Sequence, residues 1–112
     1  MQLPTLIQFQ VLCLIPPEGI GGPDLRDALK KQRVMGTGRA VFYEMMDRLR
    51  TANWVTAEPE VVEVDDDTYK QNRYRLSRDG ALAVRRFQEV AREAANARTD
   101  LGWTMADDWR MA

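Results

Sequence analysis

The chain has 112 residues, of which 45% are hydrophobic and 29% are charged, and its formal net charge is −1. This length and composition indicate one globular domain with a small core that a partner subunit would help to complete, and they exclude a disordered chain. They also exclude a membrane-spanning chain, because no apolar run reaches about 18 residues. Histidine is absent and there is a single cysteine, so we expect no enzymatic activity, no metal, no cofactor and no disulfide within the chain.

The first predicted element is a helix over Thr5 to Ile15. Its apolar residues are too dense for a surface helix and predict one that is buried on most sides. Cys13 lies inside this apolar run, so we expect a buried thiol rather than a reactive one. The run lacks the basic start and the small-residue cleavage site of a signal peptide, which favours a cytoplasmic protein.

Two further helices are predicted before the first strand. Proline at position 23 and Asp24 in the first turn favour a helix that runs to about Lys31. A Gly-Thr-Gly turn precedes the third helix, and Thr37 is a candidate for its N-cap. One side of this third helix is apolar, with Phe42, Met45, Met46 and Leu49, and the helix runs into an extended Trp54-Val55.

A hairpin with an acidic tip is predicted after the third helix. Apolar residues partly alternate from Glu58 to Val64, the stretch from Asp65 to Thr68 is expected to form the turn, and the second strand is expected over Arg73 to Leu76. Six acids and no base occupy the segment 58–67. The acidic members are Glu58, Glu60, Glu63, Asp65, Asp66 and Asp67.

A final helix is predicted to open at Ser77, Asp79 and Gly80 and to cover residues 78–98. The order of helix, helix, helix, strand, strand, helix predicts a mostly helical α+β fold: a winged helix-turn-helix with a two-stranded wing and a C-terminal dimerisation helix. We assign residues 1–98 to this domain. The tail 99–112 carries Trp103 and Trp109 and is expected to pack on the body or on a second subunit.

Four segments together resemble the PadR-like winged-helix transcriptional regulators over about residues 3 to 95. They are Thr5 to Pro17, the Gly22-Pro23-Asp24-Leu25 helix start, Phe42-Tyr43-x-x-Met46-x-Arg48-Leu49 and Tyr74-Arg75-Leu76-Ser77-x-x-Gly80. Pro23 replaces a tyrosine of the family pattern, and Ala40-Val41 departs from its usual recognition-helix opening. The resemblance implies a dimeric DNA-binding repressor whose N-terminal and C-terminal helices build the dimer. By resemblance, the candidate interface residues are Leu6, Phe9, Phe87, Val90 and Trp109; each is equally suited to a core within one chain.

Basic residues flank the acidic hairpin. Seven bases face four acids from Asp24 to Arg50, and six bases face one acid from Lys70 to Arg86. Such residues supply most of the affinity for DNA phosphates. The candidate DNA-binding residues are Thr37, Gly38, Arg39, Tyr43, Lys70, Arg73 and Arg75.

These candidates are expected to play different parts. Arg39 at the start of a major-groove helix is placed to reach guanine, and Thr37 and Gly38 are expected beside a phosphate. Tyr43 either bonds a phosphate through its phenol or packs under the wing. Arg48 is expected to pair with an acid of its own domain.

The function expected from these observations is a homodimeric DNA-binding transcription regulator, acting as a repressor on a pseudo-palindromic operator and responding to a small-molecule or protein effector. The alternative is a winged-helix protein-interaction module that uses the acidic hairpin 58–67 to engage a basic partner and does not bind DNA. The acidic tip bears on the choice between these two functions, because DNA phosphates would repel the tip unless the wing leans away from DNA. A third interpretation is that the aspartates only solvate a turn.

Overall fold

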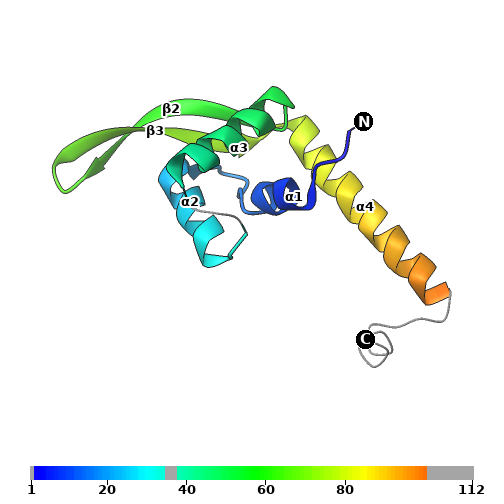
Figure 1. Ribbon diagram of the computed structural model, residues 1–112. Coiled ribbons are helices and arrows are strands. Elements are labelled where there is room, and N and C mark those ends of the chain that lie inside the picture. Colours follow the sequence, from blue (N-terminus) through cyan, green and yellow to red (C-terminus); the bar gives the residue numbers. More distant parts are fainter. Residues whose placement is uncertain (1, 35–37, 101–112) are drawn as a thin grey trace.

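The computed structural model describes residues 2–34 and 38–100 of the chain. Figure 1 shows a body of short helices from which a long hairpin and a long helix project at opposite ends. In chain order the elements are α1 (Leu6–Cys13), β1 (Ile20–Gly21), α2 (Gly22–Lys31), α3 (Arg39–Thr51), β2 (Val55–Val64), β3 (Asp67–Leu76) and α4 (Arg78–Asp100). The strands form one antiparallel sheet in the order β1-β3-β2.

α1 begins with a capping box. The backbone N–H of Gln8 donates to the Thr5 hydroxyl, and the backbone N–H of Thr5 donates to the Gln8 side chain at 2.8 Å. The predicted burial on most sides is wrong, because Leu6 is 59% exposed and Ile7 is 43% exposed, and the buried residues of α1 are Val11 and Leu12. Cys13 is also exposed, contrary to prediction, because Val11 and Leu12 occupy the two positions that face the core.

The helix-turn-helix follows the predicted pattern closely. α2 starts with Pro23 in its first turn, ends at Lys31 and buries Leu25 and Leu29. The buried side of α3 is the predicted one, with Phe42, Met46 and Leu49 inside and Met45 half-buried. The N-cap of α3 is Gly38 and not Thr37, which lies outside the described residues, so this capping prediction is wrong.

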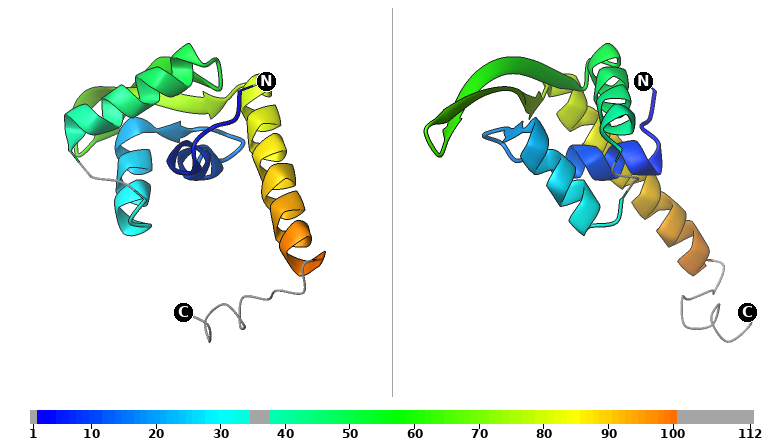
Figure 2. Two further views of the ribbon diagram at one scale, coloured as in Figure 1. Left: turned by 45° about the vertical axis from the view of Figure 1, so that its right-hand side comes forward. Right: turned by 60° about the vertical axis from the view of Figure 1, so that its left-hand side comes forward.

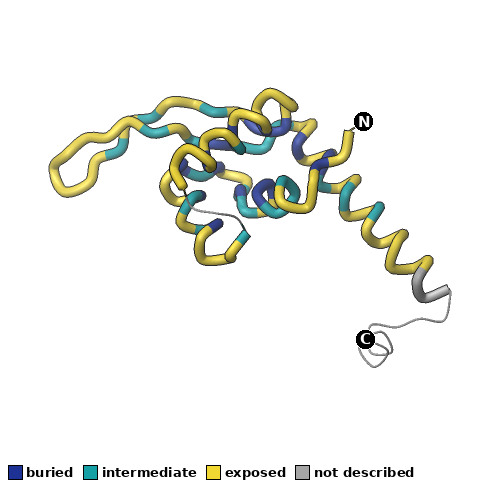
Figure 3. The backbone as a smooth tube through the Cα atoms, in the orientation of Figure 1, coloured by how far each residue is buried: buried dark blue, intermediate teal, exposed yellow. Residues whose placement is uncertain are grey.

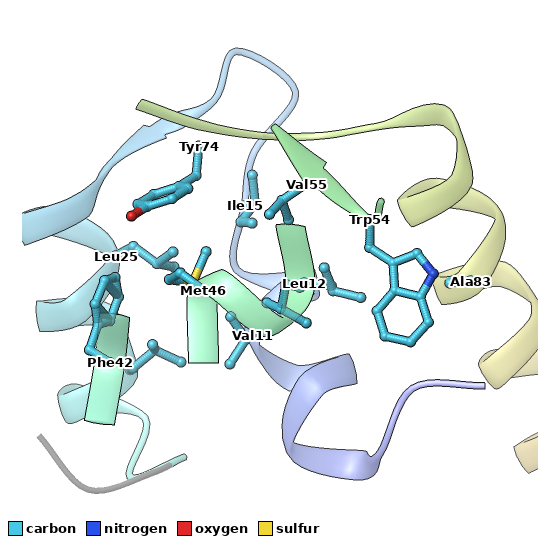
Figure 4. Packing of buried hydrophobic residues seen from close by; sticks show 12 residues of the cluster. Val11, Leu12, Ile15, Leu25, Phe42, Met46, Trp54, Val55, Tyr74 and Ala83 are labelled. Carbon is cyan, nitrogen blue, oxygen red and sulfur yellow. The ribbon is translucent and has the colours of Figure 1, made fainter. Parts of the chain in front are cut away.

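The core lies where the three short helices meet the inner end of the sheet. Its buried residues are Val11, Leu12, Ile15, Leu25, Leu29, Phe42, Met46, Leu49, Trp54, Val55, Tyr74 and Ala83. Figure 4 shows Tyr74 reaching from β3 toward Leu25, and Trp54 lying beside Ala83 of α4. Burial falls away along both projecting elements, as Figure 3 shows, and residues 91–97 of α4 are all exposed.

The hairpin is longer than predicted. Ten residue pairs join β2 to β3, from Val55 opposite Leu76 to Val64 opposite Asp67, and the turn is only Asp65-Asp66. Both turn residues have positive φ, 51° and 68°, as a type I′ hairpin turn requires. Residues 67 and 68, predicted as turn, and residues 69–72, which lay before the predicted second strand, are therefore strand. The two-residue strand β1, which pairs Ile20 with Tyr74, was not predicted and makes the sheet three-stranded.

The start of α4 is fixed against the end of α3. The Ser77 hydroxyl donates to the carbonyl of Asn53 and accepts from the backbone N–H of Gly80 at 2.9 Å. A Cβ at Gly80 would lie 1.9 Å from the carbonyl oxygen of Trp54, so only glycine allows this approach. The predicted opening of the helix is confirmed, and the helix continues two residues beyond the predicted end, to Asp100.

Candidate nucleic-acid interface

α3 turns one long side to solvent. Ala40, Glu44, Asp47 and Thr51 are exposed there, opposite the buried Phe42. The helix begins at Gly38, whose missing side chain leaves the first-turn N–H groups without a side-chain cap. A helix start of this kind offers backbone donors and the positive end of the helix dipole to an anion.

Two of the three arginines of α3 are held by carboxylates one turn away. Arg48 Nη2 lies 2.8 Å from Glu44 Oε1, as expected for an arginine paired within its own domain, and Arg50 lies 3.3 Å from Asp47. Arg39 has no carboxylate partner among the described residues. Its guanidinium instead lies 5.8 Å from the centroid of the Tyr43 ring, a cation–π contact that leaves its donors available.

Tyr43 combines parts of both alternatives that the sequence left open. Its ring meets Phe42 edge-on, with centroids 5.2 Å apart, so it packs against the domain. The residue is nevertheless 39% exposed. It lines an open hollow of about 280 Å³ between α3 and the hairpin, together with Pro59, Lys70, Gln71 and Asn72.

The hairpin has two faces of different character. Side chains alternate along each strand, so the register places Val55, Ala57, Pro59 and Val61 on one face with Lys70, Asn72, Tyr74 and Leu76. This face carries the buried Tyr74 and is the side that meets the helices. We call it the helix side. The opposite face, which we call the outer side, carries Glu58, Glu60, Gln71, Arg73 and Arg75.

The outer side is tied together by ion pairs. Arg73 Nε donates to Glu60 at 2.8 Å, Gln71 donates to the same carboxylate at 2.7 Å, and Arg75 donates to Glu58 at 3.0 Å. The hydrogen bonds from Gln71 and Arg73 lower the pKa of Glu60. Each outer arginine is thus matched by a carboxylate.

The sequence-predicted DNA-binding residues therefore divide in space. Arg39, Tyr43 and Lys70 lie along α3 and the helix side of the hairpin, beside Gly38. Arg73 and Arg75 lie on the outer side, and Thr37 lies outside the described residues. Asn72 and Pro59, which share the hollow with Tyr43, were missed, although the period-two alternation counted from Lys70 already places Asn72 beside it.

The hairpin tip keeps its negative charge. Glu58 and Glu60 are paired, whereas Glu63, Asp65, Asp66 and Asp67 have no ion pair among the described residues. The side chains of Val64 and Tyr69, beside these acids, are about half exposed.

The predicted dimer residues also divide. Phe9 and Phe87 stack on each other within the chain, with centroids 4.3 Å apart, and both are half-buried. Leu6 is on the open side of α1, Val90 is half-buried on α4, and Trp109 lies outside the described residues. Among the residues described here, no cluster of three potential metal ligands occurs, and no helix is long and apolar enough to cross a membrane.

No family model matches the sequence, and no curated protein matches it. Solved structures do share its fold. A PadR-like transcription factor from Bacteroides fragilis is 17% identical with a TM-score of 0.68, covering 86% of this chain and 89% of that chain. A PadR family transcription regulator from Clostridium difficile R20291 is 10% identical with a TM-score of 0.68, covering 88% of this chain and 100% of that chain.

A third similar structure contains DNA. It is a mutant of MarR from Escherichia coli complexed with operator DNA, 20% identical with a TM-score of 0.63, covering 96% of this chain and 70% of that chain. At these identities the likeness establishes the fold. The chain has the winged-helix fold of PadR-like and MarR regulators, as predicted.

Proposed function

We propose that this chain, which has the fold of PadR-like and MarR regulators, is a homodimeric DNA-binding transcription regulator that acts as a repressor. The observation that carries the proposal is the solvent-facing α3 with an arginine at its start that no carboxylate of the described chain neutralises. The operator DNA in the similar MarR structure supports the same use of the fold.

In this account α3 enters the major groove with its N-terminal end foremost. Arg39 donates two hydrogen bonds to the O6 and N7 atoms of a guanine, a pairing that no other base offers in the same geometry. The N–H groups at Thr37 and Gly38 face a neighbouring phosphate. Binding involves no covalent chemistry, and repression follows because the bound protein occupies the promoter.

The second copy is proposed to pack on α1 and α4. Leu6, Ile7 and Leu82 are exposed between 37% and 59%, and residues 91–97 of α4 are all exposed. Figure 2 shows α4 leaving the body in both views. Val90, with Trp109 as a further candidate, belongs to the proposed interface. Two α3 helices about 34 Å apart would then read a pseudo-palindrome. A small-molecule or protein effector would act by changing that spacing.

The alternative function remains a protein-interaction module. The four acids of the hairpin tip, which have no ion pair within the described part of the chain, lie next to the exposed Val64 and Tyr69 and favour a basic partner protein. On this account DNA is not bound.

Selection of randomised duplex DNA by the purified protein tests the two functions. The regulator predicts enrichment of one sequence with two inverted half-sites. Enrichment of no sequence, even at low salt, would reject the regulator and leave the interaction module.

A further inference from the structure

The hollow between α3 and the hairpin is lined by polar side chains from both elements. Lys70 is exposed and has no ion pair among the described residues, and Tyr43 contributes the edge of a phenol. Asn72 is exposed and lies two residues from the buried Tyr74 on the same face of β3. Pro59 and Gln71 complete the lining and add no charge.

This set of groups suits a phosphodiester. An ammonium is a strong point-charge donor to phosphate oxygens, and phenol and amide groups donate to the same oxygens in protein–DNA complexes. The hollow, at about 280 Å³, is open and large enough for one such group. Its neighbour along α3 is Arg39, which contacts the ring of Tyr43.

We infer that this hollow holds one backbone phosphate of bound duplex DNA between Tyr43, Lys70 and Asn72, so that the wing engages DNA through its base and not through its tip. This inference rests on the proposed function and names the part of the wing that serves it. The outer arginines, Arg73 and Arg75, brace the hairpin through Glu60 and Glu58 and do not take part.

The position of the acidic tip agrees with this division. Three residue pairs separate Lys70 from Asp67, which corresponds to about 10 Å along a strand, and two pairs separate it from Glu63, about 7 Å, on the same face. The Debye length at physiological ionic strength is roughly 8 Å. A phosphate in the hollow therefore meets repulsion mainly from Glu63, whereas a wing inserted tip-first would place four acids against the DNA backbone.

The first test measures the salt dependence of binding to the selected duplex. Replacing Lys70 by glutamine removes one phosphate contact, so the slope of log affinity against log salt should fall by about 0.9 and affinity should fall about tenfold at low salt. The matched control is the double variant Glu58→Gln/Arg75→Gln, which keeps the net charge and removes a pair from the outer side. Its slope and affinity should remain those of the wild type.

The second test locates the phosphate. A series of duplexes, each with one methylphosphonate in place of a phosphate, should show one position per half-site at which the neutral group weakens wild-type binding but not that of Lys70→Gln. Tyr43→Phe, which loses only the hydroxyl, should show partial coupling at the same position.

The possible results separate the two proposals. A wild type that binds the duplex with no position coupled to Lys70, or an equal loss of slope in the outer-side control, would overturn the phosphate hollow and leave the regulator in place. A wild type that binds no duplex at all would overturn both.

Discussion

The rings of Phe9 in α1 and Phe87 in α4 stack with their centroids 4.3 Å apart and their planes inclined by 18°. This contact joins the two helices proposed for the dimer within a single chain, and so sets the direction in which α4 leaves the body. Only the first turns of α4 add to the core, through Ala83. The Phe9–Phe87 stack is therefore the outermost aromatic contact on the described part of that helix.

Removing the stack should loosen α4. We expect Phe87→Ala to lower the free energy of unfolding by about 2 kcal/mol, since the ring is only half-buried. A double-mutant cycle with Phe9→Ala should give a coupling of about 1 kcal/mol. Urea unfolding at one fixed protein concentration measures both, because a dimer's stability depends on concentration. A coupling near zero would show that the rings do not support each other in solution.

Gly80 should be intolerant of a side chain. Gly80→Ala places a Cβ 1.9 Å from the Trp54 carbonyl oxygen, and we expect a loss of more than about 2 kcal/mol in the free energy of unfolding. The matched control is Gly38→Ala, where the nearest atom to an added Cβ is 3.7 Å away, and its cost should stay below about 1 kcal/mol. Thermal denaturation compares the two variants, and equal midpoints would contradict the close packing of α4 on the end of α3.

The acidic turn provides a test in which charge and conformation have separate effects. Changing Asp65-Asp66 to Asn-Gly keeps the positive φ of both positions and should stabilise the protein by about 1 kcal/mol. Changing the same pair to Ala-Ala removes the same two charges but disfavours positive φ, so it should destabilise the protein. Both variants should bind DNA more tightly at low salt. Calorimetry and a binding titration together check this, and equal stability of the two variants would reject the turn geometry.

Glu60 should contribute to stability in a pH-dependent way. Its pKa is lowered in the folded protein by hydrogen bonds from Gln71 and Arg73, so its stabilising effect is present above the ordinary value of 4.5 and is lost as pH falls through the lower folded value. We expect Glu60→Gln to lower the melting temperature at pH 7 and to reduce the difference between pH 7 and pH 3. Glu63→Gln, on the same strand and without an ion pair among the described residues, is the control. An identical pH dependence of Glu60→Gln and wild type would contradict the pairing.

How far the sequence predicts the molecule depends on burial. α2, α3 and the start of α4 were predicted because an apolar stripe and a Pro, Gly or Ser signal mark each of them. The outer half of β3, Asp67 to Asn72, was not predicted, because an exposed strand needs no apolar face and aspartate is disfavoured in strands. β1 has only two residues, too few to show a period.

The site was predicted in part for similar reasons. The site residues of α3 were predicted together because they belong to one helix, and Arg39 was predicted as a DNA contact because it stands at the start of that helix. The placement of Lys70 against Tyr43 depends instead on which side of the hairpin meets the helices, and that is decided by the burial of Tyr74. Cys13 was misplaced because an apolar run shows which residues can be buried but not which of them face the core, and Val11 and Leu12 occupy those positions.

Equilibrium titration of the selected duplex with wild type, Arg39→Ala and Arg92→Ala tests the central claim most directly. Arg92 is exposed on the side of α4 opposite Val90 of the proposed interface, so its substitution matches the charge change at a distance from α3. We predict two chains bound per duplex, a loss of roughly 5-fold to 150-fold for Arg39→Ala, corresponding to about 1–3 kcal/mol for one bidentate base contact, and little change for Arg92→Ala. Binding of the selected duplex no tighter than a scrambled one, or equal affinities of Arg39→Ala and Arg92→Ala, would contradict a sequence-specific regulator that reads DNA through α3.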